Sequence, residues 1–421
     1  MIREFLITKV ARAKIKRLLN FDFAKKVPFG EKKHRLPILM YVHVPFCEEL
    51  CPYCSFHRFP LERETAKAYF SALRKEILLY RDLGFEFEGV YIGGGTPTVL
   101  IDELLETLRL IRSSFKVKEI SCETNPNHLK DEYLKLLSGE GVKRLSVGVQ
   151  SFDDQILKSV KRFHKYGSGK EIIERIYATT GYFQTLNVDM IFNFPNQTLK
   201  SLENDIRILN EIPVSQITYY PLMVSSMTRK SMEANLGKLD LRKEKLFYET
   251  ILKGLSKEFF PATAWCFSKT TGMIDEYVVR YDEYAGLGSG SIGYIDGFAY
   301  ANTFHLRKYI DGVKKGEIPV EGIRKYTRKE RMQYDFLMKL FGLRLNLAEL
   351  KKKYGRASMF LILPELFFFS ALGALKFDRE RISLTNCGLY FWVIMMREFF
   401  TGVNNFRDFL RNLPQAHAGL S

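Results

Sequence analysis

Short apolar runs alternate with amphipathic stretches from about residue 37 onward. The apolar runs are rich in Val, Ile and Tyr and are bounded by polar or glycine-containing segments, which is typical of buried strands. We expect six strands, at Ile38–Val44, Gly89–Ile92, Glu119–Glu123, Arg144–Val149, Thr185–Ile191 and Gln216–Leu222. Apolar residues at helical spacing predict helices between them, at Thr65–Tyr80, Ile101–Ser113, Leu129–Leu137, Lys170–Thr179 and Leu199–Leu209.

Six strand–helix repeats in order predict an α/β fold with a parallel sheet wound as a barrel or partial barrel. In such barrels the chemistry lies at the carboxyl ends of the strands. The alternation of strands and helices becomes less regular after about residue 226. There Lys238–Leu255 predicts a helix, and Tyr284–Gly297 predicts a glycine-rich loop with short strands. Beyond Tyr326 the chain is mostly helical, with a short strand at Arg381–Leu384. We therefore divide the chain into an N-terminal extension, a core barrel, a barrel extension and a small C-terminal domain, at residues 1–36, 37–226, 227–325 and 326–421.

The most apolar stretch of the chain is Ala357–Leu375, whose length approaches that of a membrane span. Pro364 and Glu365 lie at its centre, and a carboxylate in mid-bilayer is costly. We interpret the stretch as two buried helical turns that are interrupted at the proline.

The formal net charge is +16, and residues 1–36 carry half of it, with 11 Lys and Arg against 3 acids. The segment Ile2–Phe23 mixes these cations with apolar residues, so it predicts a basic amphipathic helix. Such a helix either packs on the main domain, which we favour, or lies on an anionic membrane surface. It lacks the continuous apolar core of a signal peptide. No nucleic-acid recognition motif accompanies the charge.

Three of the six cysteines, Cys47, Cys51 and Cys54, fall within eight positions directly after the first strand. Such crowding in a cysteine-poor chain indicates metal ligands in a reducing compartment, such as the cytoplasm, rather than disulfides. Cysteines on a short loop suit an iron–sulfur cluster. Two alternatives remain: a buried helix face, which Pro45 and Pro52 oppose, and a zinc site completed by His43 or His57.

Later strand ends also carry candidate ligand-binding groups. Gly93–Gly95 lets the backbone approach a ligand closely, although a tight turn would explain it equally well. Glu123 ends the third strand, where a barrel side chain can face the cavity. Asp189 lies within an apolar run, where an acid is costly unless it is paired or liganded.

The Cys-x3-Cys-x2-Cys spacing, with Tyr53 before the third cysteine, resembles that of the radical S-adenosylmethionine (SAM) superfamily. The resemblance extends through GGGTPT, ETNP, GVQSF, Arg-Phe-His and VDMIFNFPNQT, in the same order. It implies a partial (β/α)6 TIM-like barrel with a mostly helical C-terminal domain. It also implies a [4Fe–4S] cluster on Cys47, Cys51 and Cys54. The implied SAM contacts are Tyr41, Tyr53, Gly93, Gly94, Gly95, Thr96, Glu123, Gln150, Arg162 and Asp189, with Thr98 and Met223 nearby.

The context YVHVPFCEELCPYCSF resembles one branch, the oxygen-independent coproporphyrinogen III oxidases and the related haem chaperones. The oxidases carry a further cysteine where this chain has Phe56. The chaperones usually carry a His-Asn…Tyr-Trp stretch where this chain has residues 276–284. The resemblance therefore implies an oxidoreductase-like enzyme that cleaves SAM and acts on a tetrapyrrole. A haem-binding chaperone and a methyltransferase or haem-ring-opening enzyme are the alternatives. A flavodoxin or ferredoxin would supply electrons.

Overall fold

A curved, twelve-stranded sheet forms the centre of the molecule in the computed structural model, which describes residues 2–23, 38–255, 257–270 and 277–412. Its middle consists of six parallel strands in sequence order. All six predicted strands are thus confirmed, with bounds that differ by at most two residues. They are β1 (Ile38–Val44), β4 (Phe87–Gly94), β5 (Glu119–Thr124), β6 (Val142–Gln150), β7 (Thr185–Phe192) and β8 (Gln216–Pro221).

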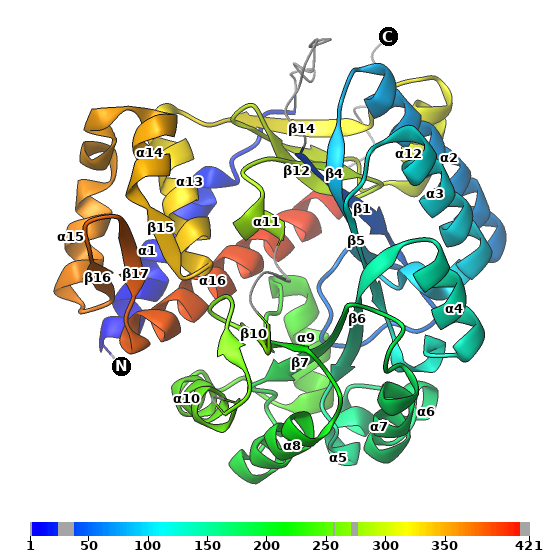
Figure 1. Cartoon of the computed structure of the whole chain (residues 1–421), viewed down its shortest axis with the longest axis horizontal. Coiled ribbons are helices and arrows are strands. Elements are labelled where there is room, and N and C mark those ends of the chain that lie inside the picture. Colours follow the sequence, from blue (N-terminus) through cyan, green and yellow to red (C-terminus); the bar gives the residue numbers. More distant parts are fainter. Residues whose placement is uncertain (1, 24–37, 256, 271–276, 413–421) are drawn as a thin grey trace.

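The five predicted helices lie along the outer side of the sheet (Figure 1) and bury their apolar faces against it. Local chemistry fixes where several of them begin. The Ser168 hydroxyl and the Glu171 carboxylate form a capping box at one helix, and the Glu62 carboxylate accepts two backbone N–H groups at another. The five are α2 (Arg63–Asp82), α3 (Ile101–Ser114), α4 (Asp131–Gly139), α7 (Gly169–Ala178) and α8 (Leu199–Glu211).

Both edges of the sheet are extended by later parts of the chain. β11 (Tyr284–Leu287) returns to pair in parallel with β1, and β12 (Ile292–Ile295), β13 (Phe298–Asn302) and β14 (Val320–Lys325) follow as antiparallel strands. At the other edge, β10 (Cys266–Ser268) pairs antiparallel with β8, and β9 (Phe260–Pro261) pairs with β10 as the outermost strand. Because β14 and β9 end the sheet, the barrel is partial, as expected.

The C-terminal region is mostly helical, as expected, with a small three-stranded sheet. Its last helix, α16, runs from this region toward the central sheet (Figure 1). The elements are α13 (Arg328–Phe341), β15 (Arg344–Asn346), α14 (Leu347–Tyr354), η3 (Arg356–Ile362), α15 (Leu363–Ala371), β16 (Leu375–Phe377), β17 (Arg381–Leu384) and α16 (Asn386–Arg411).

The apolar stretch around Pro364 is interrupted as predicted, because η3 ends at Ile362 and the proline lies in the first turn of α15. Its predicted burial is only partly right. Phe360 and Phe367 are 73% and 79% exposed, whereas Glu365 is buried and paired with Lys14. Among the described residues, no helix is both long and apolar enough to cross a membrane.

The basic N-terminal segment forms α1 (Ile2–Leu18), and this helix packs on the folded protein, although on α16 of the C-terminal region and not on the main domain that we favoured. Ile7, Ala11 and Ile15 are buried along one face. Arg12 pairs with Glu398 of α16 at 2.6 Å. The helix is therefore part of the folded structure.

Two helical predictions were less accurate. The helix expected over Lys238–Leu255 begins only at Glu244, as α10 (Glu244–Leu255), because residues 237–243 form a turn and an irregular segment. A separate helix, α9 (Ser226–Leu236), precedes it and was not predicted. Residues 271–276, which include the start of the segment at 276–284, lie outside the described part of the chain.

Glu76 of α2 has a fully buried carboxyl group that connects this helix to the glycine-rich segment through hydrogen bonds. It accepts hydrogen bonds from Gly288 N (2.8 Å), the Tyr309 hydroxyl (2.6 Å) and Asn302 Nδ2 (3.1 Å). Burial nevertheless raises its pKa from 4.5 to about 7. The folded state therefore binds a proton more tightly than the unfolded state does.

We expect this carboxyl to contribute stability below about pH 4.5 and to lose that contribution as the pH rises through about 7. The pKa difference corresponds to a free energy on the order of 3 kcal/mol. Urea unfolding of wild type and Glu76→Gln measures this contribution. We expect the free energy of unfolding of wild type, relative to that of the variant, to fall between pH 4.5 and 7. Glu64→Gln, at an exposed position of the same helix, is the control for the loss of a carboxyl group from α2.

Candidate functional site

The three clustered cysteines lie on one loop that its own backbone holds closed. β2 (Phe46–Cys47) pairs in parallel with β3 (Phe59–Pro60), so the two ends of the loop lie side by side. Within it, Arg58 Nη2 donates to the carbonyls of Cys51 (2.7 Å) and Cys54 (2.6 Å). This arginine therefore fixes the turn that carries the second and third cysteines.

All three cysteines line one cavity, which has a volume of about 310 Å³. Cys47 and Cys51 are buried and Cys54 is half-buried. Burial raises the pKa of the Cys47 thiol to about 12, with a further contribution from Cys54, so this thiol is neutral unless a bound cation draws off its proton.

The two histidines considered for zinc do not line this cavity. His43 Nδ1 faces the Tyr41 hydroxyl at 2.9 Å, and its Nε2 faces the His57 carbonyl at 2.8 Å. Burial lowers the pKa of His43 to about 3 and that of His57 well below its usual value. Within the described residues, no group of three or more His, Cys, Asp or Glu side chains surrounds a single metal position.

The glycine run at the end of β4 permits close packing around the cysteine loop. Gly94 has φ +117°, and a Cβ there would lie 2.6 Å from the His43 ring. A Cβ on Gly95 would lie 2.6 Å from the Phe46 carbonyl oxygen. Both glycines line the cavity together with Thr96. Gly93 does not line it and instead lies beneath the carboxylate of Glu123, and Thr98 faces Thr124 and His128 behind the cavity wall.

Glu123 projects from the end of β5 into the same cavity. Its Oε1 accepts from the Tyr91 hydroxyl (2.8 Å) and its Oε2 from Gly94 N (3.1 Å). These bonds hold the carboxylate against the glycine run. Tyr91 was not predicted as a site residue, although its position in the strand before the glycines places it on the cavity side.

A chain of hydrogen bonds runs from Arg162 to the cysteines. Arg162 Nη2 donates to Asn125 Oδ1 (2.9 Å), Asn125 Nδ2 to Thr96 Oγ1 (2.8 Å), and Thr96 Oγ1 to Cys47 Sγ (3.7 Å). Arg162 Nη1 also approaches Cys51 Sγ at 3.6 Å. Positive charge and hydroxyl donors are thus directed at two of the three sulfurs, which stabilises thiolates.

Gln150, at the end of β6, has a left-handed backbone with φ +77°. The pairing of β6 with β7 shifts register between Gly148 and Gln150, and the Gln150 side chain lines the cavity. A glutamine in this region of φ is uncommon and strained, and such positions concentrate at binding sites.

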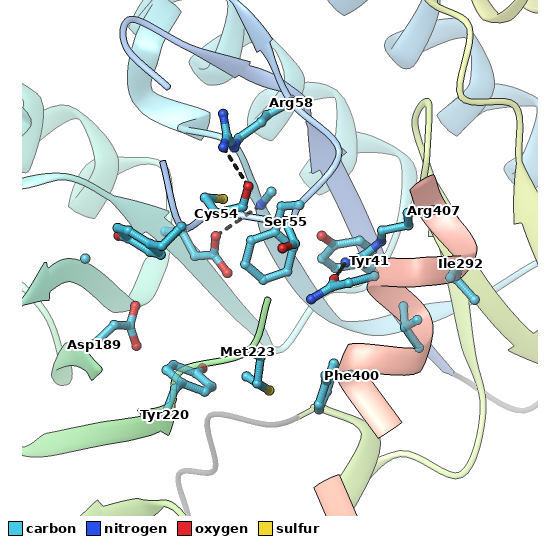
Figure 2. Close-up of a pocket in the computed structure, with 18 of the residues that line it drawn as sticks. Tyr41, Cys54, Ser55, Arg58, Asp189, Tyr220, Met223, Ile292, Phe400 and Arg407 are labelled. Atoms are coloured by element: carbon cyan, nitrogen blue, oxygen red, sulfur yellow. Dashed lines mark hydrogen bonds between the residues drawn. The ribbon is translucent and has the colours of Figure 1, made fainter. Parts of the chain in front are cut away.

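Asp189 of β7 also lines the cavity, on the side of Tyr220 and away from Arg407 (Figure 2). Its carboxylate accepts from the Ser146 hydroxyl and from Asn187 Nδ2, each at 2.8 Å. The predicted cost of an acid within an apolar strand is therefore offset by these hydrogen bonds and by access to the cavity.

The structure brings together nearly all of the predicted residues, since Tyr41, Tyr53, Gln150, Arg162 and Met223 also line the cavity, whereas Gly93 and Thr98 do not. Both ends of the chain contribute walls that were not predicted. Leu19 and Phe21 follow α1, and Phe399, Phe400, Val403, Asn404 and Arg407 lie on α16. Together with aromatic and aliphatic residues of β8, the barrel extension and the start of the C-terminal domain, they form a mainly apolar chamber beside the cysteine loop. The further chamber residues are Tyr220, Val278, Tyr284, Ile292, Tyr294, Ala299, Tyr326 and Tyr334.

Comparison with known proteins gives one consistent relationship. Residues 41–209 match the model of the radical SAM superfamily. A haem chaperone, HemW of Bacillus subtilis, is 29% identical over 365 residues, which cover 83% of this chain and 95% of that protein. An oxygen-independent coproporphyrinogen III oxidase of Helicobacter pylori is 26% identical over 389 residues, covering 85% and 84%.

The fold agrees with these relationships. The solved structure of the coproporphyrinogen III oxidase HemN of Escherichia coli superposes with a TM-score of 0.76, at 21% identity, over 90% of this chain and 95% of that one. The chain thus matches the radical SAM superfamily over residues 41–209, and over most of its length it is similar to the haem chaperones and the oxygen-independent coproporphyrinogen III oxidases.

Proposed function

We propose that this protein is a radical SAM enzyme that reductively cleaves SAM and acts on a tetrapyrrole. The observation that carries the proposal is one continuous cavity. Three cysteines on a closed loop, the carboxylates Glu123 and Asp189, and the residues of the aromatic chamber all line it. Members of the superfamily hold a [4Fe–4S] cluster and SAM.

The residues present suit both groups. Cys47, Cys51 and Cys54 would hold three irons, with Arg162 and Thr96 directed at the sulfurs. Gly94, Gly95, Thr96, Glu123, Gln150 and Arg162 would bind the methionine end of SAM, and Asp189 the ribose hydroxyls, while Tyr41 and Tyr53 line the cavity beside the cysteines. When bound, the cluster supplies the electron that breaks a C–S bond of SAM.

The aromatic residues of the chamber favour a flat, apolar substrate. Tyr284, Tyr294, Tyr334 and Phe400 present rings to it, and ring faces stack well on a planar macrocycle. The relatives are named as coproporphyrinogen III oxidases and haem chaperones, and both coproporphyrinogen III and haem are tetrapyrroles. A donor such as a flavodoxin or ferredoxin would dock on this basic protein, whose net charge is +16.

A second candidate, a haem chaperone with little catalysis, is supported by Phe56. This residue stands where the resembling oxidases have a further cysteine, and it lines the cavity with 45% of its surface exposed. A chaperone needs the chamber for haem and has less need of rapid SAM cleavage. Peripheral contact with a membrane through α1 stays a prediction for either function.

Purified protein, reconstituted anaerobically with iron and sulfide, is expected to convert SAM into methionine and 5′-deoxyadenosine when a reductant is added. Haem and coproporphyrinogen III would be offered in separate reactions, with SAM and porphyrin products followed by mass spectrometry. Decarboxylation of coproporphyrinogen III identifies an oxidase. Saturable haem binding with slow SAM turnover identifies a chaperone. The absence of SAM cleavage in all reactions would contradict the enzyme proposal.

A further inference from the structure

The C-terminal helix α16 contributes a buried arginine to the cavity. Arg407 is 7% exposed and lines the cavity beside Asn404 of the same helix. Its Nη1 donates to Asn404 Oδ1 at 3.0 Å, and its guanidinium lies 5.2 Å from the centre of the Phe56 ring. Figure 2 shows Arg407 entering from α16 on the side of Tyr41 and Ser55. A helix distant in sequence thus places a planar cation beside the cysteine loop.

Positive charge is concentrated at this end of the cavity. Arg58 is bonded to the carbonyls of Cys51 and Cys54, and Arg411 Nη2 donates to the Ser55 carbonyl at 3.3 Å. The pKa of Arg411 lies below its ordinary value because of burial, with Arg407 and Arg58 contributing in the same direction and Asp408 opposing them. Because the charge of Arg411 is offset by its ion pair with Asp408 at 3.1 Å, the positive potential around Ser55 comes from Arg407 and Arg58, and it favours an anionic group.

Many of the other side chains that line the chamber are apolar, among them Phe21, Ile292, Phe400 and Val403. A ligand that fits such surroundings has a flat apolar body and an anionic group at its edge. Arginine is suited to carboxylates because its planar fork donates two parallel hydrogen bonds to them.

We propose that Arg407, oriented by Asn404 and packed against Phe56, binds a peripheral carboxylate of the tetrapyrrole and so sets the position of the macrocycle relative to the cysteine loop. This inference rests on the proposed function and assigns a residue for it. The methionine carboxylate of SAM has the same chemistry, so the experiment must distinguish the two carboxylates.

The test uses full-length protein that has been reconstituted anaerobically. Its affinities are measured for protoporphyrin IX, for protoporphyrin IX dimethyl ester and for SAM. Arg407→Gln is expected to weaken binding of the free acid roughly 10- to 100-fold, because a charge-assisted hydrogen bond is lost. Binding of the ester and of SAM should change by less than about three-fold. Arg407→Lys, which keeps the charge but not the fork, should lie between wild type and Arg407→Gln for the free acid.

Arg411→Gln is the matched control, since it removes an arginine one turn further along α16 whose side chain does not line the cavity and whose charge is offset by Asp408 at 3.1 Å. It should leave affinity for the free acid within about three-fold of wild type. Equal weakening of acid and ester, or no weakening of either, overturns the inference, as does a loss confined to SAM. If Arg407→Gln does not fold, Arg407→Lys and Asn404→Ala are measured in the same way, and unchanged affinity for the acid in both overturns it. Failure of wild type to bind either porphyrin instead contradicts the tetrapyrrole proposal itself.

Discussion

Replacing any one of Cys47, Cys51 and Cys54 with alanine is expected to remove the iron–sulfur cluster and to reduce SAM cleavage by roughly 10³-fold or more. The three thiols line one cavity from a loop that is closed by the pairing of β2 with β3 and by Arg58. With one thiol missing, an iron loses its protein ligand, and the loop offers no other thiol in its place. Iron and sulfide content, the electron paramagnetic resonance signal of the reduced protein and the yield of 5′-deoxyadenosine measure the loss.

Cys266→Ala is the control for this series, because Cys266 is also buried but lies in β10, away from the loop and outside the cavity lining. This variant should retain iron and turnover close to wild type. Full iron content together with undiminished cleavage in any of the three loop variants would contradict the assignment of that cysteine.

Strands such as β1 and β7 could be predicted because nearly all of their residues are buried. A fully buried parallel strand appears as a continuous apolar run, so Ile38–Val44 and Thr185–Ile191 agree with β1 and β7 to within one residue. Their order then predicts that Glu123 and Gly95 meet at one edge, since the carboxyl ends of parallel strands lie together. The resemblance in motifs added Gln150 and Arg162, for which the sequence pattern alone offers no reason.

The remainder of the cavity depends on contacts between distant parts of the chain. β11 pairs with β1 although about 240 residues separate them, and Phe21 stacks on Phe406 at 4.6 Å between ring centres. No local pattern specifies such pairings. Arg407 reads in sequence as an ordinary helical arginine, and only the packing of α16 against the barrel turns it toward the cysteine loop. The exposure of Phe367 could not be predicted either. Whether a helix face is buried depends on the elements that pack against it, and among the described residues none covers this side chain.

Glu123→Gln and Asp189→Asn are each expected to weaken SAM binding roughly 10- to 100-fold while leaving the cluster in place. Glu123 is held by Tyr91 and Gly94 beside the cysteine loop, where it can accept hydrogen bonds from an ammonium group. Asp189 is held by Ser146 and Asn187, where it can accept hydrogen bonds from ribose hydroxyls. Each substitution keeps the shape of the side chain and removes its charge. Anaerobic equilibrium dialysis with labelled SAM, alongside iron analysis of the same samples, measures both properties.

Glu119→Gln provides the matched control, because Glu119 begins the strand that Glu123 lies near the end of and pairs with Arg280 at 2.7 Å, away from the cavity lining. Its affinity for SAM should stay within about three-fold of wild type. The two carboxylates act on different parts of the ligand, so we expect their effects on the free energy of binding to add in the double variant. Wild-type affinity in both single variants, with iron intact, would show that the cavity binds SAM through other groups or does not bind it at all. A loss of iron in either variant would instead place that carboxylate in the support of the cysteine loop, which Glu123 reaches through its hydrogen bond to Gly94.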